Sequence, residues 1–224
     1  MRESIVGPST GKLASLDADQ LARVLAEQAV RNHKYSRFGF TSELEVGSLV
    51  QSILKSKSTR TKISVIAQIL KPFIDGNEAR LRALEPIQQT VDTFVDSINS
   101  FYCDKSLTFH LQQGIRIVSK DGAVLDPKLL SSGEKQLLIL FCSVIMTGRK
   151  PSIFIIDEPE LSLNIKWQRQ LIDALLACVK NASVQFVFAT HSLEILARHR
   201  RNVVRLENQR LGKESIQAPL FTNA

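Results

Sequence analysis

Two adjacent carboxylates follow a short hydrophobic run in the second half of the chain. The run is Ile153–Ile156, and Asp157 and Glu158 come directly after it. Continuously apolar runs of this length are typical of parallel strands buried on both faces, and ligands of open α/β sheets bind beyond the carboxyl ends of such strands. Adjacent residues at a strand end point in different directions, so each carboxylate can have its own task. The alternative is an acidic turn after a core strand.

A second group of polar residues lies at the start of a mostly apolar helical run, Leu137–Met146. Ser131 and Ser132 precede Gly133 there. Side chains at this position cap free backbone N–H groups, and the same N–H groups with the positive helix end form an anion site. The alternative is simple capping, with Glu134 favourably placed near the helix dipole.

One of the 4 histidines has an unusual setting. His191 closely follows the apolar run Phe186–Val187–Phe188, and Thr190 and Ser192 flank it. A lone histidine is usually structural, and the other three histidines, His33, His110 and His199, are expected to be structural.

The order of these groups resembles the C-terminal lobe of ABC-type AAA ATPases, in the branch of SMC-like, RecF-like and OLD-like proteins. The resemblance covers roughly residues 107–207, and it is strongest to ATPases of bacterial DNA-repair and defence systems, through the segments LSSGEKQ and DEPELSL. It implies an α/β fold in which parallel strands are flanked by helices and preceded by a helical arm. Ser132 and Glu134 depart from the transporter signature LSGGQ, which argues against a transporter.

The resemblance also implies roles for individual residues, with ATP and Mg²⁺ as ligands. Asp157 would support Mg²⁺, largely through coordinated water, and Glu158 would orient and polarise the water that attacks the γ-phosphate. His191 would be the switch histidine that touches the γ-phosphate. In dimers of the family the signature closes over the γ-phosphate held by the opposite protomer; its residues here are Ser131, Ser132, Gly133 and Glu134.

The segment Glu160–Asn164 resembles the D-loop, which couples the two sites of such a dimer. Many relatives have histidine at the position of Asn164, so a direct catalytic role is not assigned to it. Trp167 is expected to pack rather than to stack on a base.

A phosphate-binding Walker A loop and a Q-loop glutamine are not found. Gly7–Lys12 looks like a phosphate loop, but three residues separate its glycines where the motif has four, and Leu13 replaces the hydroxyl that holds magnesium. A turn is expected there. Three accounts follow: a fragmentary reading frame, which is favoured, a partner chain that carries the N-terminal lobe, or a degenerate ATPase used as a scaffold.

Periodicity predicts a helical region, residues 1–104, followed by an α/β lobe, residues 105–224. Helices are expected at 16–32, 43–55, 62–74 and 78–101, with breaks at Pro72 and Asp75–Asn77, and the pattern is too irregular for a sustained coiled coil. Short antiparallel strands are expected at 107–111, 115–119 and 123–125. The α/β part is expected to contain helices at 132–147, 164–180 and 192–199, and strands at 152–157, 184–189 and 202–207.

Composition is that of an ordinary globular protein with a basic balance. The 29 Lys+Arg against 22 Asp+Glu give a net charge of +7, which indicates an anionic partner such as DNA or a set of solvated basic faces. The basic clusters lie at residues 55–62 and 198–205. No apolar run approaches the ~20 residues of a membrane helix, and 3 scattered cysteines favour a reducing cytoplasm.

The sequence therefore predicts an ATP-binding and ATP-hydrolysing subunit, or a fragment of one, of a dimeric DNA-associated ABC-type ATPase in DNA repair or phage defence. A homodimer or a partner chain with the N-terminal lobe is expected, and any nuclease or effector would be a separate chain. The alternative is a catalytically incompetent ATPase remnant that serves as a dimerisation or effector-binding module.

Overall fold

The computed structural model describes residues 17–55, 60–146, 151–180 and 182–205. The glycine-containing segment Gly7–Lys12 lies outside these residues. Contacts between Cα atoms divide the chain into two compact units. The helical unit contains the residues up to Gln89 together with Phe109–Gly114, and the motif unit contains Thr90–Thr108 and the residues from Ile115 onward. The two units are described separately below.

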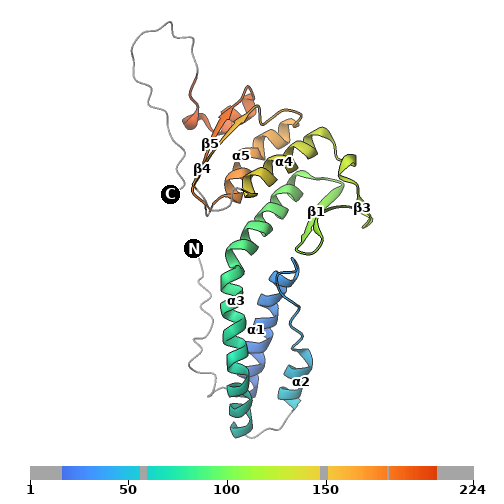
Figure 1. The fold of residues 1–224 in the computed structure, drawn as a ribbon, viewed down its shortest axis with the longest axis vertical. Coiled ribbons are helices and arrows are strands. Elements are labelled where there is room, and N and C mark those ends of the chain that lie inside the picture. The colour runs from blue at the N-terminus through green and yellow to red at the C-terminus, as the bar shows by residue number, and fades with distance from the viewer. Residues whose placement is uncertain (1–16, 56–59, 147–150, 181, 206–224) are drawn as a thin grey trace. The chain divides into compact units, whose positions relative to one another are not determined.

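The helical unit is built from α1 (Ala18–Ser36), α2 (Gly47–Lys55) and α3 (Arg60–Phe101) as far as Gln89 (Figure 1). A capping box opens α1: the Asp17 carboxylate accepts from Gln20 N, and the Gln20 side chain accepts from Asp17 N. One apolar cluster joins the three helices, formed by Leu21, Leu25, Ile53, Ile63, Ala67 and Ile74.

Helix α3 corrects the expectation of two separate helices. It runs without interruption from Arg60 to Phe101, with Pro72 and Pro86 inside it. A proline inside a helix removes one hydrogen bond and costs about 3 kcal/mol or more. Burial along the helix offsets this cost, because buried residues recur in steps of seven, at Ala67, Ile74, Leu81, Gln88 and Val95. A heptad spacing of burial keeps one face of a long helix covered.

A bend around Phe38–Gly39–Phe40 follows α1. Gly39 has a φ of 73°, in the left-handed region that glycine adopts without steric cost. The Phe38 and Phe40 rings contact the Phe109 ring, with centroids 6.2 and 6.3 Å from it. Leu111 N donates to Phe38 O at 2.9 Å, so backbone and ring contacts both tie the bend to the hairpin at Phe109–Gly114.

A three-stranded sheet follows α3 in the chain, in the order β1 (Lys105–His110), β2 (Gly114–Ser119) and β3 (Val124–Leu125). Strands β2 and β3 are antiparallel, and Ile117 lies opposite Leu125. The turn between β2 and β3 contains Gly122, whose φ is 87°. The 3-10 helix η2 (Pro127–Leu129) then leads into the motif segment.

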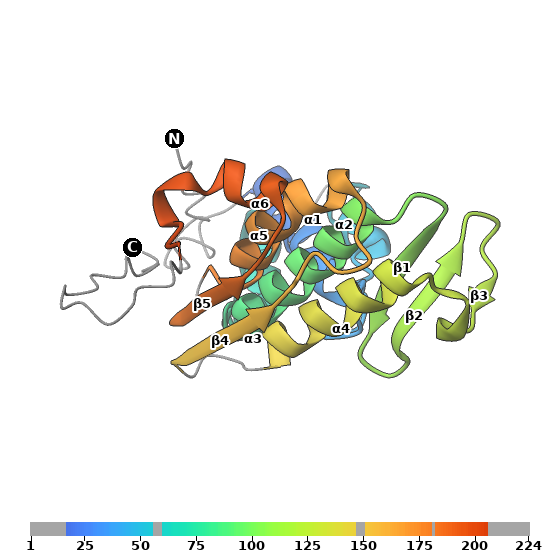
Figure 2. The same cartoon turned by 90° about the horizontal axis from the view of Figure 1, so that it is seen from above.

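The α/β part of the motif unit alternates helices and strands. Its elements are α4 (Ser132–Met146), β4 (Ser152–Asp157), α5 (Ile165–Cys178), β5 (Val184–Ala189) and α6 (Leu193–Arg198). Strands β4 and β5 are parallel and paired from Ser152↔Val184 to Asp157↔Ala189, so both strands end at the same edge (Figure 2). The strands expected at 152–157 and 184–189 are confirmed.

Burial of the two parallel strands differs from the expectation that both faces are covered. Phe154 and Phe186 pack together with ring centroids 5.6 Å apart, but Ile153 and Ile155 on the other face of β4 are 66% and 77% exposed. Burial therefore alternates along β4, because the described residues cover only one face of the strand pair and leave the other face open.

The strand expected at 202–207 is not present in its described part. Arg200–Asn202 form the 3-10 helix η3, residues 203–205 have no regular structure, and residues 206 and 207 lie outside the description. A strand needs a neighbour for its backbone groups, and among the described residues β5 pairs with β4 alone.

The core of the motif unit surrounds Phe101. Its ring lies 5.9 Å from the Phe141 ring and 6.0 Å, edge to face, from the Trp167 ring. The packing role predicted for Trp167 is confirmed. All three cysteines are free thiols. Within the described part of the chain, no helix has the length and apolar character needed to cross a bilayer.

Candidate active site

The parallel register of β4 and β5 brings the two predicted catalytic segments together. Asp157 is the register partner of Ala189, so the carboxylates that follow β4 and the Thr190–His191 segment that follows β5 leave the same sheet edge. The two segments are joined beyond the strands, because Glu158 N donates to Ala189 O at 2.8 Å. Asp157, Glu158 and His191 therefore come from neighbouring strand ends.

Glu158 has an unusual backbone conformation. Its φ of 44° lies in the left-handed region, which costs a residue with a side chain about 1–3 kcal/mol. Two backbone hydrogen bonds hold it there: Glu158 N donates to Ala189 O, and Leu161 N donates to Glu158 O at 3.0 Å. Strained residues of this kind cluster at functional sites, where the surrounding structure fixes them.

The two carboxylates are open to a ligand. Asp157 and Glu158 are both exposed, and neither side chain has a hydrogen-bond or ion-pair partner among the described residues. Those residues also contain no group of three or more His, Cys, Asp and Glu side chains that could hold a metal ion. Magnesium is commonly bound by one or two carboxylates together with substrate phosphates and water, and a single open carboxylate at Asp157 fits this mode.

The Glu160 side chain links the two segments, a role that was not predicted from the sequence. Its Oε1 atom accepts from His191 N at 2.9 Å and from Ser192 N at 3.0 Å. Its Oε2 atom is buried and has no hydrogen-bond partner in the part of the chain that the structure describes. The D-loop carboxylate thus positions the backbone of the histidine segment. An acidic residue two positions after Glu158 was visible in the sequence, but its partners lie 31 and 32 residues away.

Further hydrogen bonds fix the backbone beside His191. Ser192 N also donates to Thr190 Oγ1 at 3.0 Å, and the Ser192 hydroxyl accepts from Ile195 N as the cap of α6. The same hydroxyl donates to Gln168 Oε1 at 2.7 Å, and Gln168 Nε2 donates to Leu163 O at 2.9 Å. The His191 side chain itself is exposed and has no partner among the described residues. The segment is therefore held by its backbone, and its imidazole is open.

The signature segment forms a capping box at the start of α4. Ser131 Oγ accepts from Glu134 N at 3.3 Å, and Glu134 Oε2 accepts from Ser131 N at 2.7 Å. Glu134 is buried, and Lys105 Nζ donates to its two oxygens at 3.0 and 3.2 Å. The Glu134 carboxylate is thus occupied by protein donors, as in the capping alternative, and Ser132 is exposed at the first position of the helix.

Electrostatics around Glu134 follow from this contact. Burial raises the pKa of Glu134, but the Ser131 N–H and the Lys105 ammonium outweigh burial, and the pKa lies below its ordinary value. The hydrogen bond to Glu134 raises the pKa of Lys105 in turn. Burial, followed by the charge of Glu134, raises the pKa of Tyr102, whose hydroxyl donates to Glu134 O. The carboxylate and ammonium are both charged at neutral pH.

Gly133 brings the signature helix against the D-loop. A Cβ atom at this position would lie 2.6 Å from Ser162 O and 3.2 Å from the Trp167 ring. Ser162 has a φ of 64°, and the next helix begins after Asn164, whose side chain accepts from Trp167 N as its cap. The D-loop therefore touches two predicted groups: Glu160 near its start reaches His191, and Ser162 lies on Gly133.

Strand-end carboxylates, a capped helix start and a histidine segment lie on adjacent elements of a mixed α/β fold, and this arrangement is consistent with an ABC-type AAA ATPase. The chain belongs to the family described as AAA domain, putative AbiEii toxin, Type IV TA system, which it matches over residues 25–197.

Curated relatives agree with this class. The retron Vc95 probable ATPase of Vibrio cholerae serotype O1 biovar El Tor is 29% identical over 177 residues, which cover 71% of this chain and 33% of the relative. The retron Ec83 probable ATPase of Escherichia coli is 27% identical, covering 57% and 29%. The lipoprotein-releasing system ATP-binding protein LolD of Ruegeria pomeroyi is 38% identical over 89 residues, covering 40% and 37%. The chain spans about a third of the length of these relatives.

Proposed function

We propose that this chain carries the Walker B, signature, D-loop and switch-histidine elements of a Mg²⁺-dependent ATPase that hydrolyses ATP as a dimer. One observation carries the proposal: the exposed, unpartnered carboxylates of Asp157 and Glu158 lie beside the backbone-held His191 at one sheet edge. Such an edge is where α/β sheets bind nucleotides. The two relatives named as retron ATPases favour a role in defence within this class.

Each residue has a distinct task in the proposed reaction. Asp157 holds the Mg²⁺, which neutralises charge on the phosphates when bound. Glu158 orients the attacking water and accepts its proton, and its fixed backbone conformation directs the carboxylate. His191 donates toward the γ-phosphate. The exposed Ser132 at the start of α4 approaches the γ-phosphate bound by the other protomer, while Gly133 packs against the D-loop and Glu134 keeps the helix start in place.

The phosphate-gripping Walker A loop is proposed to come from an N-terminal lobe, in the same polypeptide or in a partner chain. The open face of β4 supports this, because Ile153 and Ile155 are large apolar side chains exposed at the site-bearing sheet. A two-stranded pair with one uncovered apolar face is a poor independent sheet, and further strands or helices of that lobe would cover it.

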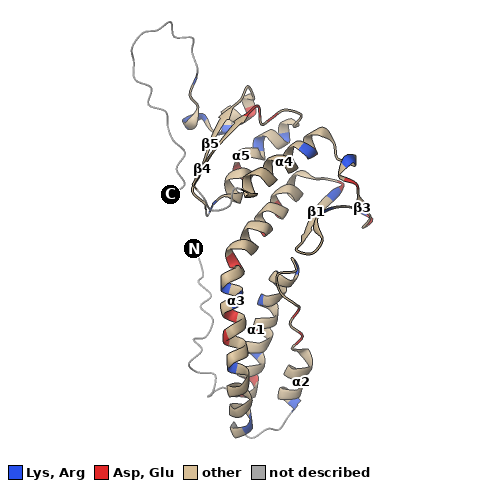
Figure 3. Ribbon diagram, in the orientation of Figure 1, with Lys and Arg blue, Asp and Glu red and all other residues tan. Residues whose placement is uncertain are grey.

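Contact with DNA is a further part of the proposal. Basic residues gather where α6 passes into η3 (Figure 3), and Arg200 and Arg201 are exposed. Arg198 in the same segment is paired with Asp173 at 2.9 Å, so it is the less available of the three. Exposed arginines suit phosphate contacts without base specificity.

ATP hydrolysis in the presence and absence of the Walker A lobe tests this function. The chain mixed with, or joined to, that lobe should hydrolyse ATP with Mg²⁺, on the order of 1 s⁻¹, and the chain alone should not. Asp157→Asn should weaken Mg²⁺ binding, so that hydrolysis requires a higher Mg²⁺ concentration. Arg169→Gln, on the exposed surface of α5, is the matched control and should leave this requirement unchanged. A complete assembly that binds its partner but never hydrolyses ATP would favour the alternative, a non-catalytic dimerisation or effector-binding module.

A further inference from the structure

Helix α3 carries a second apolar row on the side opposite its buried one. Its buried side chains include Ala67, Ile74 and Leu81. Two positions after each of these, about 200° around a helix of 3.6 residues per turn, the residues are exposed and uncharged. This row is named the outer face of α3, and its members are Val65, Ile69, Pro72, Gly76, Ala79 and Ala83. The solvent side of a surface helix normally carries polar and charged residues, so the outer face is unusual.

Large apolar side chains are exposed along this side of the helix. Val65 and Ile69 are 50% and 71% exposed, and Phe73 and Ile87, on one edge of the outer face, are 51% and 53% exposed. At about 1.5 Å per residue, the stretch from Val65 to Ile87 is about 33 Å long. Single exposed apolar residues are common on protein surfaces, but a continuous row of this length indicates a contact surface.

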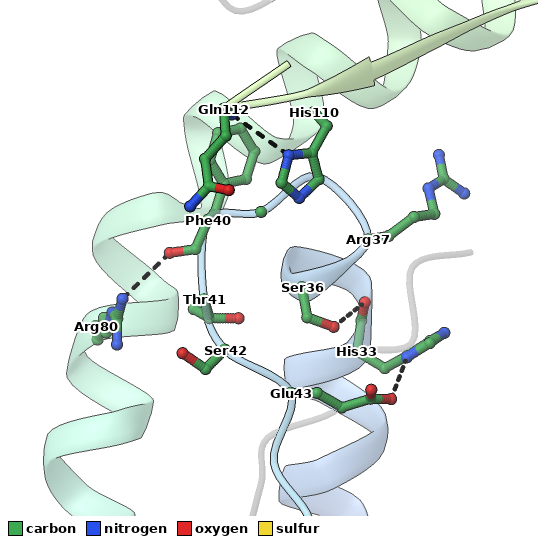
Figure 4. Close-up of a pocket in the computed structure, with 11 residues that line it drawn as sticks. His33, Ser36, Arg37, Phe40, Thr41, Ser42, Glu43, Arg80, His110 and Gln112 are labelled. Carbon is green, nitrogen blue, oxygen red and sulfur yellow. Dashed lines mark hydrogen bonds and ion pairs between the residues drawn. The ribbon is translucent and has the colours of Figure 1, made fainter. Parts of the chain in front are cut away.

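One charged residue lies between the two edge side chains, and it is held toward another element. Arg80 stands one turn or two from Phe73 and Ile87, and its guanidinium donates to Phe40 O at 3.2 Å, in the loop that follows α1 (Figure 4). This hydrogen bond directs the charge toward the loop. The apolar side chains of the edge therefore remain open to a partner.

The outer face is complementary in size to its own reverse. Its first three side chains, from Val65 to Pro72, are bulky, and its last three, from Gly76 to Ala83, are small. Nothing lies within 4 Å of the Cβ position of Gly76. A twofold axis between Gly76 and Ala79 would set the bulky half of each copy on the small half of the other. A parallel pair would set bulky on bulky and leave a gap along the small half.

Charges beside the outer face are also complementary in such an antiparallel pair. Asp75 and Arg82 are seven residues apart, so they lie on one edge of α3, and this edge faces the same edge of the other copy. The Asp75 carboxylate has no partner among the described residues. Arg82 is exposed and donates to Glu78 at 2.6 Å, which leaves further donors free. The axis between Gly76 and Ala79 places Asp75 of one copy opposite Arg82 of the other.

We propose that the outer faces of α3 from two copies of this chain pair antiparallel. The pairing needs no nucleotide, because every residue that forms it belongs to the helical unit. A face one helix wide is smaller than a standard stable interface, so the contact is weak, in the micromolar to millimolar range. It adds a second point of contact between copies, separate from the ATP-dependent one proposed for the motif unit.

Sedimentation equilibrium of the full chain without nucleotide tests the pairing. The wild-type chain should dimerise as its concentration rises through the micromolar to millimolar range. Ile69→Glu should weaken dimerisation at least ~10-fold, the scale of losing one buried isoleucine side chain. Val30→Glu is the matched control, because Val30 is 67% exposed on α1, outside the outer face, and its replacement should leave dimerisation unchanged.

A charge exchange tests the antiparallel register. Asp75→Arg and Arg82→Asp should each weaken dimerisation, because each sets like charges opposite one another in a homodimer. An equimolar mixture of the two variants should dimerise as well as the wild type, since both facing pairs are then opposite in charge. Recovery in the mixture also shows that both variants are folded.

Three results would overturn the proposal: a chain that stays monomeric at every concentration, an Ile69→Glu variant that dimerises like the wild type, or a mixture as weak as its components. The first would assign the outer face to another occupant. A dimer that needs ATP, Mg²⁺ and the Walker A lobe, and that is unchanged by Ile69→Glu, would likewise overturn the pairing through α3 and would leave the proposed ATPase dimer intact.

Discussion

The Glu160 carboxylate accepts a hydrogen bond from the backbone N–H of His191, with 2.9 Å between Oε1 and N. This contact joins the D-loop to the histidine segment within one chain. The family resemblance implies that the D-loop couples the two sites of the proposed dimer, and in that assembly a shift of Glu160 would move the backbone of His191. The contact gives a physical route by which one site of a dimer can be coupled to the other.

Removal of this carboxylate should free the histidine segment. Glu160→Ala deletes the acceptor of two backbone hydrogen bonds and should lower the free energy of unfolding by about 1–3 kcal/mol. Hydrogen–deuterium exchange should show faster exchange at His191 and Ser192. Glu160→Gln keeps an acceptor oxygen and should show a smaller effect, and Glu194→Ala, in an exposed ion pair, serves as control. Unchanged exchange at both amides would contradict the positioning role.

The signature glycine should not tolerate a side chain. Gly133→Ala places a methyl group 2.6 Å from Ser162 O, which is backbone and cannot rotate away, so the helix and the D-loop must separate. Urea unfolding should show a loss of about 1–3 kcal/mol, the usual cost of overpacking. Gly76→Ala is the matched control, because nothing lies within 4 Å of its Cβ position and alanine favours a helix. Equal free energies of unfolding for the Gly133→Ala and Gly76→Ala variants would contradict a close contact between Gly133 and Ser162 O.

The partly buried pair of Glu134 and Lys105 should make the free energy of unfolding depend on pH in the acid range. The folded-state pKa of Glu134 lies below its ordinary value of 4.5, so its contribution is present above that value and is lost as pH falls through the lowered pKa. Glu134→Gln should lower the free energy of unfolding by about 1.5–3 kcal/mol near neutral pH. Urea titrations at several pH values should also show a smaller fall in this free energy below pH 4.5, the acid limb of the stability curve. Asp104→Asn, also beside Lys105 but exposed, should keep the limb. An unchanged acid limb in Glu134→Gln would contradict the assignment.

DNA binding by the segment after α6 should be weak and dependent on salt. A double change of Arg200 and Arg201 to Glu should lower the affinity for single-stranded DNA and reduce the magnitude of the slope of log affinity against log salt by about 0.7 per lost phosphate contact. Fluorescence anisotropy measures both. A double change of the exposed Arg116 and Lys120 to Glu, on β2 and the turn after it, alters the net charge by nearly the same amount and is the control. Affinity that does not change with salt would identify these residues as a solvated face.

The sequence predicted the elements that position the site better than it predicted their surroundings. The strands at 152–157 and 184–189 and the helix from residue 132 were predictable, because each combines an apolar run with local caps or breakers. Pro72 and Asp75–Asn77 predicted breaks that α3 does not have, since burial in steps of seven outweighs the local cost of proline. Tertiary packing of this kind is invisible to local periodicity.

The candidate site shows the same division. Asp157, Glu158 and His191 could be proposed from their place after apolar runs, and the register of β4 and β5 shows how close those segments lie. The contacts of Glu160 and Gly133 could not be proposed, because each depends on a partner about 30 residues away in the chain. Distant hydrogen bonds and close backbone contacts are set by the fold, and residue type alone does not identify them.

The central claim is tested most directly by Glu158→Gln in the assembly that includes the Walker A lobe. This change keeps the shape of Glu158 and removes the charge that polarises water. ATP and Mg²⁺ binding should persist, hydrolysis should fall by ~10²-fold or more, and the ATP-bound dimer should accumulate in size-exclusion chromatography with ATP and Mg²⁺. A Glu158→Gln protein that remains monomeric and still hydrolyses ATP at the wild-type rate would contradict the account.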